Sequence, residues 1–284
     1  MTTLVTPVSR PPTALARRDR VLWFLKDVMV LAGRSLARIR REPETLSDVT
    51  IQPVLFVLLF AYVFGGAIRI PGGGSYHEYL IGGMLGMGLA STAPGTAVAL
   101  VSDMSSGIVD RFRSLPMSRA AVLAGRTLAD LLTQVIGVLV VAGVGLTIGW
   151  RVHAGFGGVI AAFGLALLFG YSFTWLGAWL GMLLRSAEAA QQSGFIVFLP
   201  LTFVSNAFVP TQGMPGWLAL IADWNPLSAV AAACRRLLGN PDPSAALHAW
   251  PMQHPELAVM LWSAALLAVF APLAVTLYRR KSLG

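Results

Sequence analysis

The sequence predicts an all-α polytopic membrane protein, and both its composition and its long uncharged stretches indicate this class. Hydrophobic residues make up 56% of the chain and charged residues only 12%, with a mean hydropathy of +0.69. A soluble domain, by contrast, carries about 25% charged residues. Because loops and open sheet edges cannot face lipid, we expect the spanning elements to be helices. Five uncharged stretches reach the roughly 20 residues that a transmembrane helix needs, namely 49–68, 79–102, 131–150, 157–184 and 257–278.

A sixth uncharged stretch, 189–222, is interrupted by prolines in its second half. With its first half counted as a span, we expect six transmembrane helices in a single domain of residues 48–279. The expected bounds of these helices are about 49–68, 79–102, 124–149, 158–184, 191–209 and 257–278.

The placement of Lys and Arg predicts the orientation of the helices. Nine of these residues lie before residue 48, four at 111–126, one at Arg185 and three at 279–281. With six spans, all of them fall on one side of the membrane. Since Lys and Arg concentrate in cytoplasmic loops, we expect both termini in the cytoplasm. Abundant Ala, Gly and Arg are typical of a GC-rich bacterial genome, so the expected location is the bacterial plasma (inner) membrane. The cations on the other side are Arg69, Arg151, Arg235 and Arg236.

Residues 1–42 divide into a tail and an amphipathic helix. Residues 1–20, which include Pro7, Pro11 and Pro12, are expected to form a flexible cytoplasmic tail. Residues 21–42 have an apolar stripe opposite a largely basic one, which favours a helix lying in the headgroup region. A soluble cytoplasmic helix is the alternative. The apolar stripe consists of Leu22, Leu25, Met29, Ala32 and Leu36, and the charged one of Asp27, Arg34, Arg38 and Arg41.

Motifs for catalysis and for nucleotide or metal binding are absent from the sequence. A P-loop needs Gly-Lys-Ser or Gly-Lys-Thr, yet the only lysines, Lys26 and Lys281, follow Leu25 and Arg280. The four histidines show no HExxH or clustered spacing, and no GxSxG motif occurs. We therefore expect no catalytic residue, no metal and no cofactor in this chain. A transporter built from it would need energy from another subunit.

Polar residues in the expected spans are candidates for function. Arg126 and Asp130 are four residues apart and can pair on one helical face. An unpaired charge at the bilayer centre would cost about 2.5–3.5 kcal/mol, so we interpret them as a structural ion pair, with gating or coupling as the alternative. In the fifth span, polar side chains either line a cavity or bind a neighbouring helix. The candidates for cavity lining are Gln191, Gln192, Ser205 and Asn206.

Pairs of glycines four residues apart predict close helix packing. The pairs are Gly82/Gly86, Gly145/Gly149 and Gly177/Gly181. This small-xxx-small spacing lets two helices approach closely. The contact would lie within one subunit or, alternatively, between two subunits.

The segment 210–256 is the longest expected outer loop. It contains two apolar pieces, 216–222 and 227–238, each opened by a proline-containing turn. Neither piece is long enough to span a bilayer. We expect a re-entrant or interfacial hairpin that covers the outer end of the fifth span.

The segment 103–119 is a charged island between the second and third spans. Apolar side chains at three-and-four spacing lie opposite a polar face, which is typical of a short amphipathic helix. The apolar face consists of Ile108, Phe112 and Leu115, and the polar face of Asp110, Arg113 and Ser114. Held on the cytoplasmic side, such a helix is expected to contact a partner. A simple topology anchor is the alternative.

Three blocks of sequence resemble one family of membrane proteins. The blocks are GIVDRFRSLPMSRAAVLAGRTLADL at 107–131, RSAEAAQQSGFIVFLPLTFVSNAFVPTQGMPGWL at 185–218 and NPLSAVAAACRRLLG at 225–239. In order and spacing, the chain resembles the ABC-2 type transporter permeases, and among them the daunorubicin/doxorubicin-resistance type. With the six spans and the N-terminal helix, the resemblance covers nearly the whole chain.

The resemblance implies partners. Two such permease chains, identical or sister chains, would assemble with two separate cassette ATPase subunits, which bind the ATP. Residues 21–42 would match the family's connecting helix. The loop after the second span would be a coupling helix, with Phe112 and Leu115 in an apolar groove of the ATPase. Its core would consist of Arg111, Phe112, Arg113, Ser114, Leu115, Pro116 and Met117.

The resemblance also implies a function. The chain would be the membrane permease subunit of an ATP-driven exporter of amphipathic drugs or lipid-like natural products, and not itself an enzyme. One alternative is export of a glycan or a lipid-linked cell-wall precursor. Another is a membrane assembly protein that transports nothing. A cassette ATPase gene beside the gene of this chain would favour the exporter.

Overall fold

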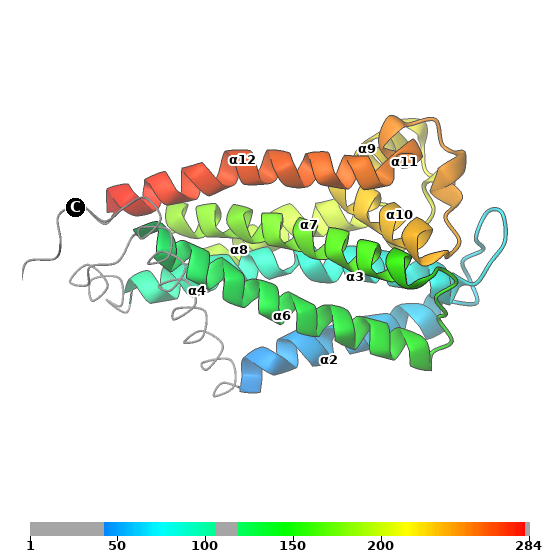
Figure 1. Ribbon diagram of the computed structural model, residues 1–284, viewed down its shortest axis with the longest axis horizontal. Helices are drawn as coiled ribbons and strands as arrows, with labels where there is room; N and C mark the ends of the chain where they lie inside the picture. Colours follow the sequence, from blue (N-terminus) through cyan, green and yellow to red (C-terminus); the bar gives the residue numbers. More distant parts are fainter. Residues whose placement is uncertain (1–42, 106–118, 282–284) are drawn as a thin grey trace, which may run out of the picture.

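The computed structural model describes residues 43–105 and 119–281, and within these ranges all regular structure is helical (Figure 1). The predicted all-α class is therefore confirmed for the described part of the chain. The expected tail 1–20, the expected interfacial helix 21–42 and the expected coupling core 111–117 lie outside the described residues.

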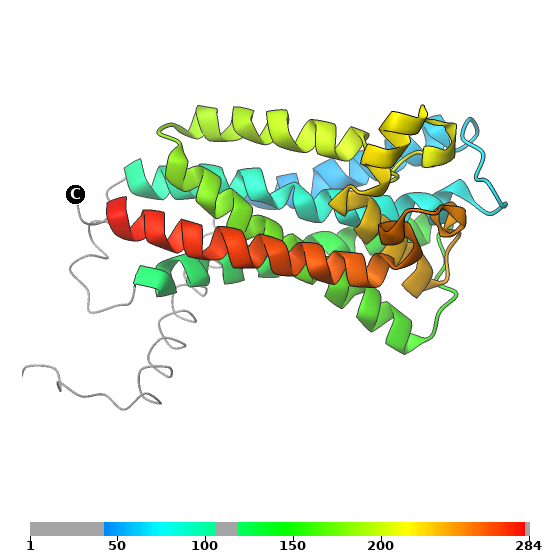
Figure 2. The same cartoon turned by 90° about the horizontal axis from the view of Figure 1, so that it is seen from above.

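Long helices lie side by side in an elongated bundle (Figures 1 and 2). The helix α2 continues without a break into the π-helix η1, and α3 is followed by α4 after one residue. The long elements are α2 (Pro43–Leu59), η1 (Phe60–Phe64), α3 (Tyr76–Ala90), α4 (Thr92–Ser105), α6 (Arg119–Thr147), α7 (Phe156–Leu183), α8 (Ala187–Phe203) and α12 (Pro255–Lys281).

Short helices gather at one end of the bundle, which we call the distal end (Figure 1). They belong to the segment between α8 and α12, where a hairpin was predicted. These elements are η2 (Thr211–Gly213), α9 (Gly216–Asp223), α10 (Pro226–Leu238), η3 (Pro243–Ala246) and α11 (Trp250–Gln253).

Four helical segments within the described ranges are long and apolar enough to cross a bilayer, as a polytopic membrane protein requires. The pair α9–α10 is bent by 69° and adds a fifth if it forms one broken span. Thr50–Phe64 is a shorter apolar helix, and α8 has 17 residues. The crossings predicted at 49–68 and 191–209 therefore stay predictions. The four segments, at Tyr76–Ser105, Leu123–Thr147, Phe156–Leu183 and Pro255–Tyr278, coincide with the other four predicted spans.

The end of α8 differs from the prediction. The helix ends at Phe203, whereas the uncharged stretch predicted helix to residue 209. The side-chain amide of Asn225 donates hydrogen bonds to the carbonyl oxygens of Leu201 and Val204. The backbone N–H of Asn206 donates to Ser228 Oγ at 2.9 Å. Side chains at the start of α10 thus bind three backbone groups where α8 ends, which favours the exit of the chain from the helix.

The second predicted span is broken at Ser91, between α3 and α4. Pro94, in the first turn of α4, has no N–H to donate to the preceding turn, which weakens a continuous helix there. The pyrrolidine ring of Pro94 packs on Gly194 of α8, where an added Cβ would lie 2.6 Å from it. The break therefore lies where α4 meets α8.

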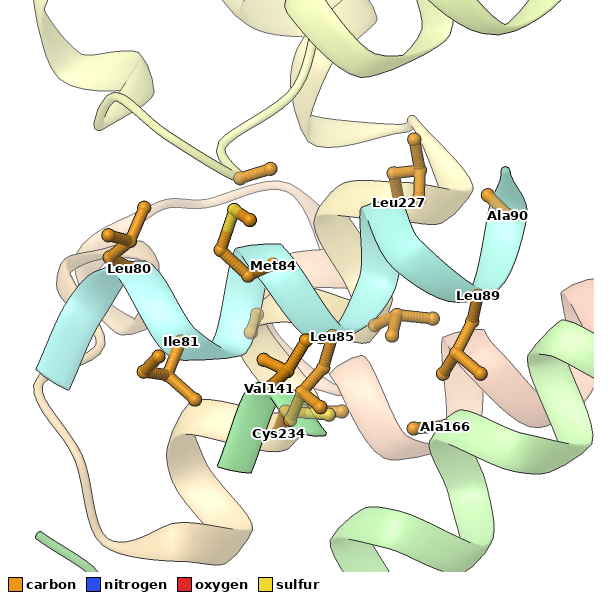
Figure 3. Close-up of a cluster of buried hydrophobic side chains, with 14 of the residues drawn as sticks. Leu80, Ile81, Met84, Leu85, Leu89, Ala90, Val141, Ala166, Leu227 and Cys234 are labelled. Atoms are coloured by element: carbon orange, nitrogen blue, oxygen red, sulfur yellow. The ribbon is translucent and has the colours of Figure 1, made fainter. Parts of the chain in front are cut away.

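The core is built around α3 (Figure 3). Eleven of the 15 residues of α3 are buried, so the helix is covered on all sides. Figure 3 shows its side chains among Leu227 and Cys234 of α10, Val141 of α6 and Ala166 of α7. This large apolar cluster fixes the distal half of the bundle.

Glycines allow the closest helix contacts, and these contacts lie within the chain. A Cβ added at Gly83 would lie 1.9 Å from the carbonyl oxygen of Ala207. Additions at Gly177 and Gly181 of α7 would lie 2.1 Å and 2.8 Å from the backbone oxygens of Ala93 and Ala97. Packing within one subunit is thus the correct interpretation for Gly177/Gly181. The other predicted glycines also lie against residues of this chain. Gly82 lies against Ala231 and Arg235, Gly86 against Leu227 and Val230, and Gly145 against Ile81 and Trp150.

Gly149 is an exception among the predicted glycines. It lies in the turn after α6 with φ of +101°, and an added Cβ would find open space. The positive φ is the reason for glycine at this position. Among the described residues Gly149 therefore makes no close helix contact, and the alternative, a contact between two subunits, stays a prediction.

The opposite end of the bundle, which we call the basal end, brings together four helix termini. The C-terminal end of α4, the start of α6, the end of α7 and the end of α12 lie there (Figure 1). A smaller apolar cluster holds them together, with Leu100 of α4, Leu123 of α6, Met182 of α7 and Tyr278 of α12.

Candidate functional site

The helices that flank the predicted coupling core are fixed at the basal end. The core itself, Arg111–Met117, lies outside the described residues. The helix α4 ends at Ser105 and α6 begins at Arg119, both at the basal end (Figure 1). Leu100 and Leu123, one turn or more inside these helices, are buried in the same cluster. The two helices are therefore packed where the intervening segment leaves and rejoins them.

The structure brings Arg126 and Asp130 together. Arg126 Nε lies 3.2 Å from Asp130 Oδ1, and the side chains are 21% and 13% exposed. The other carboxylate oxygen, Oδ2, accepts a hydrogen bond of 2.8 Å from Thr96 Oγ1 of α4. The carboxylate is thus bound by a cation on its own helix and by a hydroxyl from the neighbouring helix.

A second polar contact lies one helical turn further along α6. Gln134 Nε2 donates a hydrogen bond of 2.8 Å to Thr92 Oγ1. Thr92 in turn donates to the carbonyl oxygen of Leu89 at 2.7 Å, across the break in span 2. We call the five residues Thr92, Thr96, Arg126, Asp130 and Gln134 the polar ladder.

Sequence reasoning found only part of the polar ladder. Gln134 continues the four-residue spacing of Arg126 and Asp130 along α6, and this spacing was the available signal. Thr92 and Thr96 carry no comparable signal, because threonine is common in spans and usually binds its own helix. Thr133 and Thr127 do so here, with bonds to Ala129 and Ala124.

The four predicted cavity-lining residues do not come together. Gln191 and Gln192 are exposed on the first turns of α8. Ser205 and Asn206 are buried beyond the other end of α8, at 3% and 2% exposure. Ser205 Oγ donates to the carbonyl oxygen of Thr202, and Asn206 Nδ2 lies 3.4 Å from Met252 Sδ. The structure therefore places the second pair in the packed distal end.

A buried arginine of α10 organises that distal end, and the sequence did not single it out. Arg235 is fully buried. Its Nε donates to the carbonyl oxygen of Tyr79 at 2.8 Å, and its Nη2 donates to those of Asn206 and Ala207 at 2.9 Å and 3.1 Å. The guanidinium carbon lies 3.5 Å from the centre of the Tyr79 ring. Tyr79 also donates its hydroxyl hydrogen to the carbonyl oxygen of Asn206.

Carbonyl dipoles and an aromatic face take the place of a carboxylate partner around Arg235. Such groups satisfy a buried guanidinium through charge-assisted hydrogen bonds and cation–π attraction. These hydrogen bonds of Arg235 join α10, α3 and the 206–207 segment, which are distant in sequence. We interpret Arg235 as structural.

Two further side chains, Arg236 and Asn240, join segments of the distal end. Arg236 Nε lies 2.7 Å from Asp242 Oδ2 and the same side chain donates to the carbonyl oxygens of Met252 and Gln253. Trp150 Nε1 donates to Asn240 Oδ1 at 2.8 Å, and Asn240 Nδ2 donates to the carbonyl oxygen of Arg151 at 2.7 Å. The loop between α6 and α7 is thus bound to the segment after α10.

Metal-binding groups are not among these contacts. Within residues 43–105 and 119–281, no group of three or more His, Cys, Asp or Glu side chains is placed to hold a metal ion.

Comparisons with known proteins agree with this architecture. Residues 26–238 match the ABC-2 type transporter family. The chain is 35% identical over 249 residues to the daunorubicin resistance ABC transporter permease protein DrrB1 of Streptomyces coeruleorubidus, covering 88% of this chain and 84% of that protein. It is 24% identical over 289 residues to the "Probable doxorubicin resistance ABC transporter permease protein DrrC" of Mycobacterium tuberculosis, covering 99% of each. These relatives are membrane subunits of transporters and not enzymes. The chain therefore belongs to the ABC-2 type transporter family, as its three sequence blocks predicted.

Proposed function

We propose that this chain is the membrane permease subunit of an ATP-driven exporter that moves amphipathic drugs or lipid-like natural products out of the cell. The observation that carries the proposal is the 35% identity to a daunorubicin resistance permease over 88% of this chain. The second relative, at 24% identity over nearly the full length of both chains, also has a drug-resistance name. An exporter of apolar compounds also suits a bundle whose lipid-facing helices expose large hydrophobic side chains.

The energy comes from a separate cassette ATPase in this proposal. The sequence holds no Gly-Lys-Ser or Gly-Lys-Thr, so the chain lacks the P-loop that binds the phosphates of ATP. Two permease chains, identical or different, assemble with two ATPase subunits. ATP is bound by the ATPase subunits only.

The contact with the ATPase is the segment after span 2. Arg111–Met117 dock in a groove of the ATPase, with Phe112 and Leu115 in its apolar part and Arg111 and Arg113 at acidic rims. One observation supports this position: the end of α4 and the start of α6 both lie at the basal end. The helices α7 and α12 also end there, and α7 leads to Arg185 while α12 contains Arg280, two of the cations that the sequence predicts to be cytoplasmic.

The topology in this proposal has six crossings and cytoplasmic termini in the plasma membrane. Besides the four long apolar segments, α2 with η1 and α8 also cross, and they pack on α6 and α4 respectively. The bent pair α9–α10 is then a re-entrant hairpin at the outer face, and residues 21–42 are an interfacial connecting helix. The excess of Lys and Arg in the segments predicted to be cytoplasmic supports this orientation.

The mechanism that follows is alternating access. ATP binding closes the two cassettes, which moves the docked segments and reorients α4 and α6. The substrate cavity is thereby exposed in turn to the inner and outer faces. Such closure moves commonly proceed as rigid-body rearrangements of packed helices.

The test uses Phe112→Ala and Arg113→Glu, with the chain co-expressed with the cassette ATPase encoded beside its gene. Copurification of the ATPase and efflux of daunorubicin are measured together. Arg69→Glu, a charge reversal at an exposed position of the distal end, is the matched control. We expect the two core variants to lose both copurification and efflux, and the control to keep both. Normal assembly and efflux in the core variants would contradict the docking of this segment.

A further inference from the structure

We propose that the polar ladder is a positioning device for coupling: it holds α4 and α6 together, so that motion of the segment between them is delivered to the inner half of span 2. The inference rests on the proposed function, because the motion originates at the ATPase. Its residues are Thr92 and Thr96 on α4 and Arg126, Asp130 and Gln134 on α6.

Two hydrogen bonds, both 2.8 Å long, form the rungs of the ladder. One joins Thr96 Oγ1 to Asp130 Oδ2, and the other joins Gln134 Nε2 to Thr92 Oγ1. Thr96 and Gln134 are each only 2% exposed, so water does not compete for these bonds. A hydrogen bond is stronger in a dry, apolar environment, especially when one partner is a carboxylate.

The spacing of the rungs makes the link rigid. Thr92 and Thr96 are four residues apart on α4, and Gln134 and Asp130 are four apart in the opposite direction on α6. Because the two rungs lie one turn apart on antiparallel helices, rotation or sliding of one helix against the other strains at least one of them. A single hydrogen bond would permit rotation about itself.

The helix α4 is also fixed on its other sides. Its backbone at Ala93 and Ala97 lies directly against Gly177 and Gly181 of α7, and Pro94 packs on Gly194 of α8. The ladder adds α6, the helix that begins just after the predicted coupling core. Motion at the basal end can thus reach α4 by two routes: directly through the C-terminal end of α4, and through α6 by way of the ladder.

The ladder ends at the break in span 2. Thr92 is the first residue of α4, immediately after Ser91. On the other side of the break, α3 is bound to α10 and to the 206–207 segment through Arg235. The apolar core is divided further along α4: Ala93 still belongs to the large cluster around α3, whereas Leu100 and Val101 belong to smaller clusters. The basal part of α4 therefore packs in different apolar clusters from α3, while its first turn still contacts the α3 cluster.

Gln134 carries a cost that simple packing would avoid. Its Oε1 is buried and has no hydrogen-bond partner among the described residues. It lies where Gly170 of α7 has no side chain, since a Cβ there would be 2.6 Å from this oxygen. A leucine would fill the site without an unsatisfied acceptor. A glutamine at this position is explained if its hydrogen bond to Thr92 has a function in coupling.

The test compares ladder variants in the complete transporter, reconstituted in liposomes with the cassette ATPase. ATP hydrolysis and ATP-dependent daunorubicin uptake are measured in the same vesicles, and their ratio is the readout. We expect Thr96→Val to lower this ratio about tenfold, the size of effect expected when a hydrogen bond to a charged group is lost. Thr96→Ser keeps the hydroxyl and should restore the ratio.

The matched control is Thr127→Val. Thr127 is a fully buried threonine of α6, and its hydroxyl binds only the carbonyl oxygen of Ala124 on the same helix among the hydrogen bonds of the described residues. The ratio should stay at the wild-type value in this variant. Thr96→Val combined with Asp130→Leu should fall no further than Asp130→Leu alone, because the Asp130→Leu variant already lacks the acceptor for the Thr96 hydroxyl.

A distance measurement provides a readout that does not depend on the substrate. Spin labels at Ser105→Cys on α4 and Leu132→Cys on α6, both exposed positions, report how far the two helices are apart. We expect one narrow distance distribution without nucleotide and after trapping with ATP and vanadate. The Thr96→Val variant should show a broadened distribution in the trapped state.

The outcomes separate the ladder from the proposed function. A wild-type complex without ATP-dependent uptake of either daunorubicin or a fluorescent phospholipid would contradict the proposed function itself. Wild-type uptake together with an unchanged ratio and a narrow distribution in Thr96→Val would overturn the ladder alone. A fall of hydrolysis and uptake in parallel, with an unchanged ratio, would also overturn it, because the role would then be structural.

Discussion

The guanidinium carbon of Arg235 lies 3.5 Å from the centre of the Tyr79 ring, although 156 residues separate them in sequence. The same side chain donates a hydrogen bond to the backbone oxygen of Tyr79 and two more to the 206–207 segment. This one residue therefore joins the start of span 2, the chain after α8 and the helix α10. The distal end of the permease depends on it.

Replacement of Arg235 by Met should destabilise the protein strongly. The carbonyl oxygen of Ala207 loses its donor in the buried site, and a buried group left without its partner costs about 3 kcal/mol. We expect a lower melting temperature of the detergent-purified protein. Arg69→Met, at an exposed distal position, should leave the melting temperature unchanged. Equal melting temperatures for both variants would show that Arg235 does not hold the distal end.

Two glycines of α3 should differ sharply when replaced by alanine. A Cβ at Gly83 would lie 1.9 Å from the backbone oxygen of Ala207, so Gly83→Ala must push α3 away from this segment. At Gly88 an added Cβ finds open space, and alanine favours the helix by about 1 kcal/mol. We expect Gly83→Ala to lower the melting temperature and Gly88→Ala to keep or raise it. Tolerance of Gly83→Ala would contradict the close approach.

Gly170→Ala should disturb the polar ladder from the side of α7. Its Cβ would lie 2.6 Å from Gln134 Oε1, so the amide must turn away and its bond to Thr92 must lengthen. We expect a lower ratio of daunorubicin uptake to ATP hydrolysis. Gly164→Ala, on the same helix with open space at the Cβ position, is the control and should match wild type. Identical ratios for both variants would argue against Gly170 as the space for Gln134.

Asn225 should show two separable roles. Its Oδ1 caps α10 by accepting from the N–H of Leu227, and its Nδ2 donates to the carbonyl oxygens of Leu201 and Val204. Asn225→Asp keeps the cap and removes both donations, whereas Asn225→Ala removes all three bonds. Loss of a cap alone costs about 1 kcal/mol. Hydrogen exchange at residues 204–209 should accelerate in both variants, and exchange at the start of α10 in the alanine variant only. Unchanged exchange at 204–209 would show that these donations do not end α8.

Much of the fold could be predicted because hydropathy over about 20 residues is a local property. The spans expected at 158–184 and 257–278 correspond to Phe156–Leu183 and Pro255–Lys281. The end of α8 could not be predicted in this way. The stretch 204–209 is as uncharged as a span, but Asn225 and Ser228 of α10 bind its backbone, and that contact is visible only in three dimensions.

The candidate site was predictable in part for the same reason. The pair Arg126–Asp130 has a local spacing, and the structure forms it. Thr96 and Thr92 of α4 bind Asp130 and Gln134 of α6, and no spacing within the α6 sequence predicts these partners. Arg235 was counted only as an outer positive charge, because its partners Tyr79 and Ala207 come from other elements. Family membership, in contrast, followed from three local blocks and is confirmed.

The central claim is that this chain moves amphipathic compounds only when a separate cassette ATPase drives it. The most direct measurement is uptake into inverted membrane vesicles of daunorubicin and of a fluorescent phospholipid. Vesicles would contain this chain alone, the ATPase encoded beside its gene alone, or both. Uptake of at least one compound is expected only with both proteins and ATP. Uptake by this chain without the ATPase, or no uptake of either compound with both proteins and ATP, would contradict the claim.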